Sequence, residues 1–121
     1  MKDIQTRSDL ETLMDAFYKR LLADDSISYI FTDVAKIDLK EHLPHIVDFW
    51  EQIILNSGSY RKNVLQVHLD LNEKTPLNSV HFHTWLSHLT AVIDQSFAGE
   101  NAEMIKTRAM SIATVMQIKM L

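Results

Sequence analysis

A single histidine lies in a short apolar segment near the middle of the chain, Asn63–Leu71. On a helix, Val64, Leu65, His68 and Leu69 share one face, because residues three or four positions apart are neighbours. His68 would then point into the apolar interior. A buried imidazole needs partners for its ring nitrogens, and this face offers no polar side chain. His68 is therefore either a core histidine bonded to a backbone carbonyl or a ligand for something bound inside the protein.

Other residues that could do chemistry lie in the first half of the chain. Tyr18 falls on the apolar stripe of a predicted helix, where a buried phenol requires a hydrogen-bond partner. His42 and His45 are three residues apart, so they are either surface histidines or half of a metal site. Pro44 lies between them and removes a backbone donor. We therefore expect His42 in a distorted first turn or just before the regular helix.

The composition limits the classes of protein that the chain can represent. Its 121 residues are enough for one domain, which we assign to residues 1–121. A net charge of −4 argues against a nucleic-acid or anionic-membrane partner. The absence of cysteine excludes disulfides, thiolate metal sites and a cysteine nucleophile. No apolar run is long enough to span a membrane or to act as a signal peptide, so we expect a cytoplasmic protein.

Apolar spacing and capping patterns predict an all-α protein. The first helix should run from Ser8 to Leu22 with a capping box formed by Ser8 and Glu11, and a short corner should follow at Ile27–Phe31. The second helix should run from Asp38 to near Asn56. The third should begin at Asn78 or Ser79 and end before a C-cap at Gly99, and the fourth should begin at Ala102. A short helix carrying His68 separates the first pair of long helices from the second, with loops around Gly58–Lys62 and Asn72–Pro76.

The order and spacing of these residues resemble the truncated haemoglobins, specifically their third group. The resemblance covers nearly the whole chain and rests on several segments together: Phe17-Tyr18, Phe31, Glu41–Trp50 with its His42 and Phe49-Trp50, His68-Leu69-Asp70-Leu71, Phe82 and Trp85. It implies a truncated globin fold, a two-over-two helical sandwich around haem. Pro44 departs from the expected pattern.

The resemblance also implies roles for individual residues. His68 matches the proximal histidine, the axial ligand of the haem iron. Tyr18 and Trp85 match the residues of a distal hydrogen-bond network that faces the bound ligand, and His42 matches the distal histidine. Ile46 would pack near the ligand, and Phe31 would stack on the porphyrin.

The chemistry of haem b (iron protoporphyrin IX) is consistent with these residues. A flat apolar ring needs a dry slot, which Phe31, Ile46, Phe49, Leu65, Leu69 and Phe82 would line. The iron needs one neutral nitrogen ligand, which His68 would supply. Donors on Tyr18 and Trp85 would each stabilise bound dioxygen by about 1.5–3 kcal/mol. Arg61 and Lys62, just before the His68 segment, would bind the propionates.

The sequence therefore predicts a haem protein that binds dioxygen, and also NO or CO. Slow release of a strongly hydrogen-bonded ligand would suit storage poorly and would favour NO dioxygenation or peroxidase-like chemistry, with oxygen transport as a further role for such a protein. Either reaction would need an electron donor that the sequence does not identify.

Two alternatives from other classes remain open on the sequence alone. One is a helical interaction or sensor domain with structural histidines, and the other is a non-haem metal site built on His42, His45 and a further ligand. Inward Glu-x-x-His pairs are scarce, which argues against a di-iron bundle. The remaining histidines, His81, His83 and His88, are expected to be solvated, although His81 or His88 becomes the iron ligand if the alignment of the His68 segment is shifted.

Overall fold

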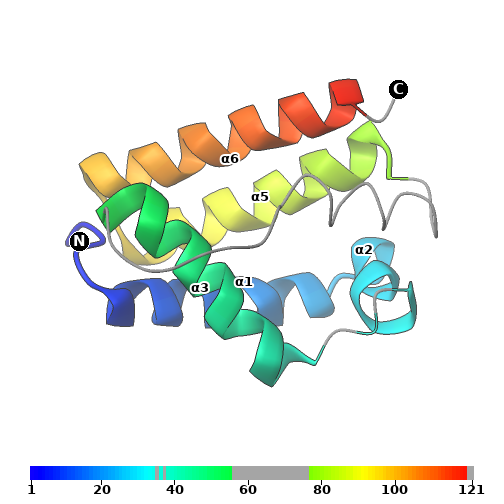
Figure 1. Cartoon of the computed structure of the whole chain (residues 1–121), viewed down its shortest axis with the longest axis horizontal. Helices are drawn as coiled ribbons and strands as arrows, with labels where there is room; N and C mark the ends of the chain where they lie inside the picture. Colours follow the sequence, from blue (N-terminus) through cyan, green and yellow to red (C-terminus); the bar gives the residue numbers. More distant parts are fainter. Residues whose placement is uncertain (35, 37, 56–76, 120–121) are drawn as a thin grey trace.

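A computed structural model describes residues 1–34, 36, 38–55 and 77–119. The elements are α1 (Arg7–Leu22), α2 (Asp25–Tyr29), the π-helical turn η1 (Ile30–Val34), α3 (Leu39–Leu55), α5 (Ser79–Ser96) and α6 (Glu100–Lys119). In Figure 1, α3 crosses α1, and α5 and α6 run side by side. The four long helices thus form two pairs, α1 with α3 and α5 with α6, and the packing of α1 on α5 joins the pairs. The predicted all-α, two-over-two fold is confirmed.

The core lies where α1 meets α3 and α5. Apolar residues three and four positions apart give α1 a continuous buried stripe, which faces α3 and α5. Val47 and Trp50 of α3 and Leu89 and Ile93 of α5 are also buried in this core. The buried residues of the stripe are Leu10, Leu13, Met14, Phe17, Tyr18 and Leu21.

The N-cap of the first helix lies two residues earlier than the sequence predicted, and the helix begins at Arg7. Its N-cap is Thr6, whose hydroxyl accepts a hydrogen bond from the Asp9 backbone N–H at 3.2 Å. The Asp9 carboxylate accepts bonds from the backbone N–H groups of Gln5 and Thr6 and pairs with the Lys2 ammonium at 2.7 Å. The capping box of Ser8 and Glu11 was therefore wrong, because Thr6 and Asp9 satisfy the same pattern and Asp9 gains Lys2 as well. Hydrogen bonding to Lys2 lowers the pKa of Asp9 to about 2.

The prediction that Gly99 is the C-cap of the third helix was also wrong. The C-cap of α5 is Phe97, and Gly99 lies just before α6 with a φ of 144°. The Asp3 carboxylate occupies the space beside Gly99 and accepts hydrogen bonds from the backbone N–H groups of Asn101 and Ala102, both at 2.9 Å. A Cβ atom at position 99 would lie 2.5 Å from the Asp3 Cγ. The glycine thus allows the N-terminal segment to cap α6.

The start of α3 settles the position of His42. The Asp38 side chain accepts a hydrogen bond from the Lys40 backbone N–H at 3.1 Å, and the His42 backbone N–H bonds to the Asp38 carbonyl at 2.8 Å. His42 is therefore inside the first turn of a helix that continues through Pro44. Pro44 is exposed, so the missing backbone bond falls on the solvent side. The alternative that placed His42 before the helix was wrong.

Candidate functional site

A buried tyrosine and a histidine meet where α1 packs on α3. The Tyr18 hydroxyl oxygen lies 2.8 Å from Nε2 of His42. Only 4% of Tyr18 is exposed, and His42 is half-buried. The two rings meet edge to face, with centroids 5.2 Å apart and planes at 82°. The predicted need of a buried Tyr18 for a partner is thus met by His42, which comes from the other helix of the pair.

The protonation of this pair determines which hydrogen remains available. Burial raises the pKa of Tyr18 well above its ordinary value, so the phenol keeps its proton. If the hydrogen on the His42 ring is at Nδ1, the Tyr18 hydroxyl donates to Nε2. If it is at Nε2, His42 donates to the Tyr18 oxygen, and the phenolic hydrogen can then be donated to a third group. Moving the ring hydrogen of His42 from Nδ1 to Nε2 therefore frees the Tyr18 hydroxyl to donate a hydrogen bond to a third group.

Aromatic rings surround the hydroxyl–imidazole pair. Phe31, in the turn η1, meets the Tyr18 ring edge to face at 5.9 Å between centroids, and Phe17 does so at 5.3 Å. Trp85 of α5 contacts Phe17 at 5.8 Å. These rings cover the Tyr18 side of the pair, whereas His42 stays half-buried.

Trp85 joins this cluster through ring contact only. Among the described residues, no hydrogen bond involves its indole nitrogen, and Phe17 has ring contacts with both Tyr18 and Trp85. Direct hydrogen bonding of Trp85 within a Tyr18 network stays a prediction.

The other predicted lining residues fall into two groups. Ile46 and Phe49 are half-buried on α3 and pack against the main core. Phe82 is 7% exposed and belongs to a second cluster with Ala113 and Met116 of α6. The structure thus brings Tyr18, His42, Phe31 and Trp85 into one aromatic cluster and places Phe82 in another. The predicted residues His68, Leu65, Leu69, Arg61 and Lys62 lie outside the described residues, as do the predicted His68 helix and both loops around it.

His88, predicted to be solvated, is the centre of a half-buried polar cluster. Its Nδ1 accepts a hydrogen bond from Arg20 Nε at 2.8 Å, and its Nε2 lies 2.7 Å from Asp24 Oδ2. A guanidinium offers only donors, so the ring hydrogen is at Nε2 and is donated to Asp24. Bonds from the Ser26 hydroxyl and from His88 lower the pKa of Asp24 to about 2. This cluster joins the end of α1 and the N-cap of α2 to α5.

His81, also predicted to be solvated, is partly exposed, and both of its ring nitrogens have partners. Nδ1 accepts from the Asn78 backbone N–H at 3.2 Å and completes the capping box of α5, and Nε2 lies 2.9 Å from the Tyr29 hydroxyl. Neither His81 nor His88 therefore has a ring nitrogen available as an iron ligand in this structure. His83 and His45 are exposed. Asp24 and Tyr29 are separated from their histidines by more than fifty residues, so sequence spacing gave no signal for either contact.

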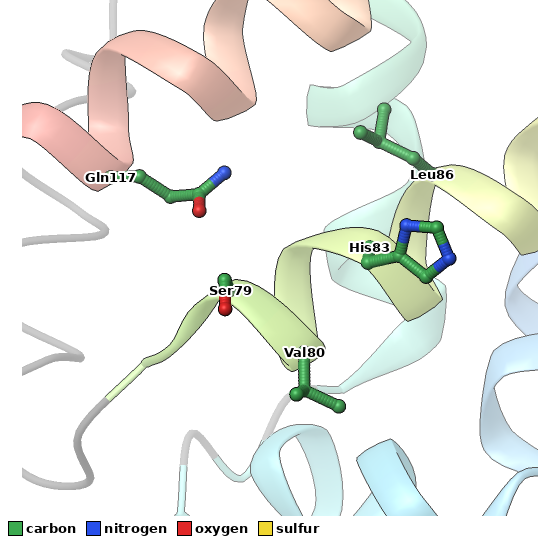
Figure 2. Close-up of a pocket in the computed structure, with 5 residues that line it drawn as sticks. All are labelled: Ser79, Val80, His83, Leu86 and Gln117. Atoms are coloured by element: carbon green, nitrogen blue, oxygen red, sulfur yellow. The ribbon is translucent and has the colours of Figure 1, made fainter.

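A surface pocket of about 470 Å³ was also not predicted. It lies between the first turns of α5 and the end of α6 and is lined by Ser79, Val80, His83 and Leu86 of one helix and Gln117 of the other (Figure 2). The three- and four-residue spacing of Ser79, Val80, His83 and Leu86 indicates a shared helix face, but the partner Gln117 could be found only from the fold.

The described part of the chain holds neither a cluster of metal ligands nor a membrane-spanning helix. Within it, no group of three or more histidine, aspartate or glutamate side chains is placed to hold a metal ion, so the alternative based on His42 and His45 gains no support there. No helix of that part is long and apolar enough to cross a membrane.

Comparison with known proteins identifies the class of fold. No protein-family model matches the chain, and no curated protein matches it. Among solved structures it is similar to a group III truncated haemoglobin from Campylobacter jejuni, with a TM-score of 0.89 and 26% identity over 100% of this chain and 96% of that one. It is also similar to the 2/2 haemoglobin from Synechococcus sp. PCC 7002, a structure in the cyanomet state with covalently attached haem. That match has a TM-score of 0.75 and 19% identity over 85% of this chain and 83% of the other.

The chain therefore has the fold of a truncated globin. Of these two structures, the group III protein is the more similar in TM-score, identity and coverage. The resemblance to the third group that the sequence predicted is confirmed.

Proposed function

We propose that this chain binds haem b and uses it to bind dioxygen and other diatomic ligands such as NO and CO. The observation that carries the proposal is the likeness to a group III truncated haemoglobin along the whole chain. The Tyr18–His42 pair, closed in by rings at the junction of α1 and α3, is the site-level support.

The described residues fit the ligand side of a haem. Phe31, Ile46 and Phe49 are half-buried apolar side chains from η1 and α3, so they can cover a flat apolar ring without a large rearrangement. The buried pair of Tyr18 and His42 supplies the polar groups that a small polar ligand needs inside such a wall. Haem, when bound, supplies a ferrous iron that takes up diatomic molecules.

The residues on the other side of the haem, opposite the bound ligand, are assigned from the resemblance. His68 would be the axial ligand, with Leu65 and Leu69 beside the ring and Phe82 closing the slot. Arg61 and Lys62 would pair with the propionates.

The chain's own groups would stabilise the ligand by hydrogen bonding. With its ring hydrogen at Nε2, His42 donates to the Tyr18 oxygen and orients the phenolic hydrogen toward the ligand. Such a bond to a partly charged ligand contributes about 1.5–3 kcal/mol. Trp85 would add an indole N–H on the side of Phe17. Strong hydrogen bonding slows ligand release, which favours NO dioxygenation or peroxidase-like turnover over storage. Turnover would require an electron donor from outside the chain.

Absorption spectra test the proposal directly. Purified protein, loaded with hemin if necessary, is compared in the ferric, dithionite-reduced and CO-treated states. We expect a Soret band that shifts on reduction and shifts again with CO. Protein that remains colourless and takes up no hemin would overturn the haem assignment and return the chain to the class of helical interaction domains.

A pair of histidine variants then tests the axial ligand. His68→Ala should lose the pigment or its normal spectrum, whereas the matched control His83→Ala should keep both, since His83 is exposed. Loss of pigment in both variants, or in neither, would contradict the role of His68.

A further inference from the structure

The short helix α2 and the turn η1 form an arm, residues 24–34, that brings Phe31 to the aromatic cluster. Figure 1 shows α2 beside the end of α1, and it packs on both α1 and α5. Ile27 and Ile30 are each 3% exposed, so they anchor the arm in the core. The Phe31 ring lies edge to face on the ring of Tyr18. The position of the arm therefore determines the wall around the Tyr18 ring.

Apolar anchoring alone does not define the orientation of so short an element. The helix α2 has five residues, and a helix of this length is not stable by itself. Burial of Ile27 and Ile30 is non-directional, because the hydrophobic effect depends on the area removed from water. Hydrogen bonds to a neighbouring helix do fix direction, because they require a narrow range of angles. Such bonds are present at both ends of α2, and each of them joins α2 to a histidine of α5.

Two histidines on one side of α5 hold the two ends of α2. At the N-cap of α2, Asp24 Oδ2 lies 2.7 Å from Nε2 of His88. At its last residue, the Tyr29 hydroxyl lies 2.9 Å from Nε2 of His81. The two histidines are seven positions apart, which places them on the same side of α5. Two turns of α5 rise about 10 Å and five residues of α2 rise about 8 Å, so both ends can be held together. We call these two contacts the clips.

A donor at the other ring nitrogen fixes both histidines in the same tautomer. Nδ1 of His81 accepts a hydrogen bond from the backbone N–H of Asn78, the N-cap of α5, at 3.2 Å. Nδ1 of His88 accepts a hydrogen bond from Nε of Arg20, on α1, at 2.8 Å. Each ring hydrogen is therefore at Nε2, where it is donated to α2. Because the Nδ1 contacts also hold the rings in place, the two donors that point at α2 are preorganised.

We propose that His81 and His88 are positioning residues for the ligand site: through the two clips they hold the arm on α5 and thereby keep Phe31 against Tyr18. Either clip keeps the arm in place when the other is lost, because the remaining hydrogen bond and the buried isoleucines still hold it. The effect on a bound ligand rests on the proposed function. The effect on the arm does not, because every contact that carries it lies within the chain.

Asparagine and glutamine variants separate the roles of the two ring nitrogens. The asparagine side chain places an oxygen near the position of Nδ1, whereas the longer glutamine side chain places an amide N–H near that of Nε2. The double variant His81→Asn with His88→Asn should therefore keep the contacts to Asn78 and Arg20 and lose both clips. The double variant His81→Gln with His88→Gln should keep a donor to each end of α2. Both double variants lack the two rings, and they differ in the clips.

Amide hydrogen exchange of the intact chain, followed by NMR, measures how readily the arm opens. We expect the amides of residues 25–34 to exchange more than about tenfold faster in the double Asn variant, and within about threefold of the unaltered rate in the double Gln variant. Each single Asn variant should lie between the two. His83→Asn, at an exposed position of α5, is the matched control and should leave exchange in the arm unchanged. Equal exchange of the arm in the double Asn variant and in the unaltered chain would overturn the proposal.

Release of dioxygen from the haem-loaded protein tests whether the arm acts on the ligand. The double Asn variant should release dioxygen at least about threefold faster, because Phe31 no longer confines the Tyr18 ring, and the double Gln variant should restore the unaltered rate. Faster exchange of the arm with an unchanged release rate would mean that the histidines hold α2 without positioning the site, and would overturn the proposal. If the unaltered chain takes up no hemin, the proposed function fails, and the exchange of the arm still decides whether the clips hold it.

Discussion

Two histidine-centred clusters flank the second half of α1, and they differ in what surrounds them. In one, Tyr18 meets His42 at 2.8 Å behind a wall of rings. In the other, Arg20 and Asp24 hold His88 at 2.8 and 2.7 Å in a half-exposed position. The hydrogen bonds are equally short. The described neighbours, which are aromatic around Tyr18 in the first cluster and charged in the second, determine what each cluster can do.

Charged partners fix a histidine in a single state, whereas a hydroxyl does not. Arg20 can only donate, and a carboxylate such as Asp24 only accepts, so the hydrogen of His88 is held at Nε2. The Tyr18 hydroxyl can donate or accept, so it is compatible with either tautomer of His42. The cluster at His88 is therefore a structural link between α1, α2 and α5. The cluster at His42 can direct a hydrogen to a ligand.

The largest expected effect comes from removing the one hydroxyl that sets the first cluster apart. In the haem-loaded protein, Tyr18→Phe should raise the dissociation rate of dioxygen by roughly ten- to a hundredfold, because a hydrogen bond of about 1.5–3 kcal/mol is lost. Stopped-flow displacement of dioxygen by CO measures this rate. An unchanged rate would remove Tyr18 from ligand stabilisation.

Tyr29→Phe is the matched control for that experiment. Tyr29 also bonds to a histidine, His81, at 2.9 Å, but it is 36% exposed and lies outside the aromatic cluster. Its loss should leave the dissociation rate of dioxygen unchanged. A similar acceleration in both variants would show that any tyrosine–histidine bond has this effect and that the buried position is irrelevant.

The buried phenol of Tyr18 should make the stability of the protein depend on pH in the alkaline range. Burial raises the pKa of Tyr18 above its unfolded value of about 10, so its contribution to stability is complete below pH 10 and is lost above it. Once the unfolded phenol ionises and the native one does not, the free energy of unfolding falls by up to about 1.4 kcal/mol per pH unit. Urea titrations at pH 9 to 11 should show a shallower fall for Tyr18→Phe than for the unaltered chain. Equal slopes would contradict the buried, protonated phenol.

Sequence reasoning predicted the buried tyrosine of the first cluster and missed the second cluster, for a physical reason. Tyr18 and Phe17 stand on an apolar stripe whose period reveals the buried face, and a buried phenol has to find a partner. The fold then brings His42 to Tyr18. His88 and Asp24 carry no such signal, because sequence patterns predict exposure for a charged residue or a histidine at any position. Only the packing of α5 against α1 and α2 shows that they are half-buried together.

The helix ends illustrate the same limit. The sequence predicted Asn78 or Ser79 at the start of the third helix, and the cap is Asn78, whose side chain accepts hydrogen bonds from the backbone N–H groups of Val80 and His81 nearby in the chain. Gly99 was misassigned because its actual partner, Asp3, is at the other end of the sequence. Thr6 and not Ser8 is the N-cap of α1, and its capping partner Asp9 is also paired with Lys2. Local patterns thus place the helices to within a few residues, and contacts between distant segments decide their ends.

The smallest predicted effect tests whether the second cluster is a structural link. His88→Ala removes the bonds to Arg20 and Asp24 and should lower the midpoint of thermal unfolding by about 3–6 °C, the shift expected for loss of a useful hydrogen bond in a domain of this size. His83→Ala, five residues earlier on an exposed turn of α5, should shift it by less than about 2 °C. Differential scanning calorimetry measures both. If the two variants are equally stable, the short distances around His88 do not contribute to stability. The contrast between the clusters would then rest on Tyr18 and His42 alone.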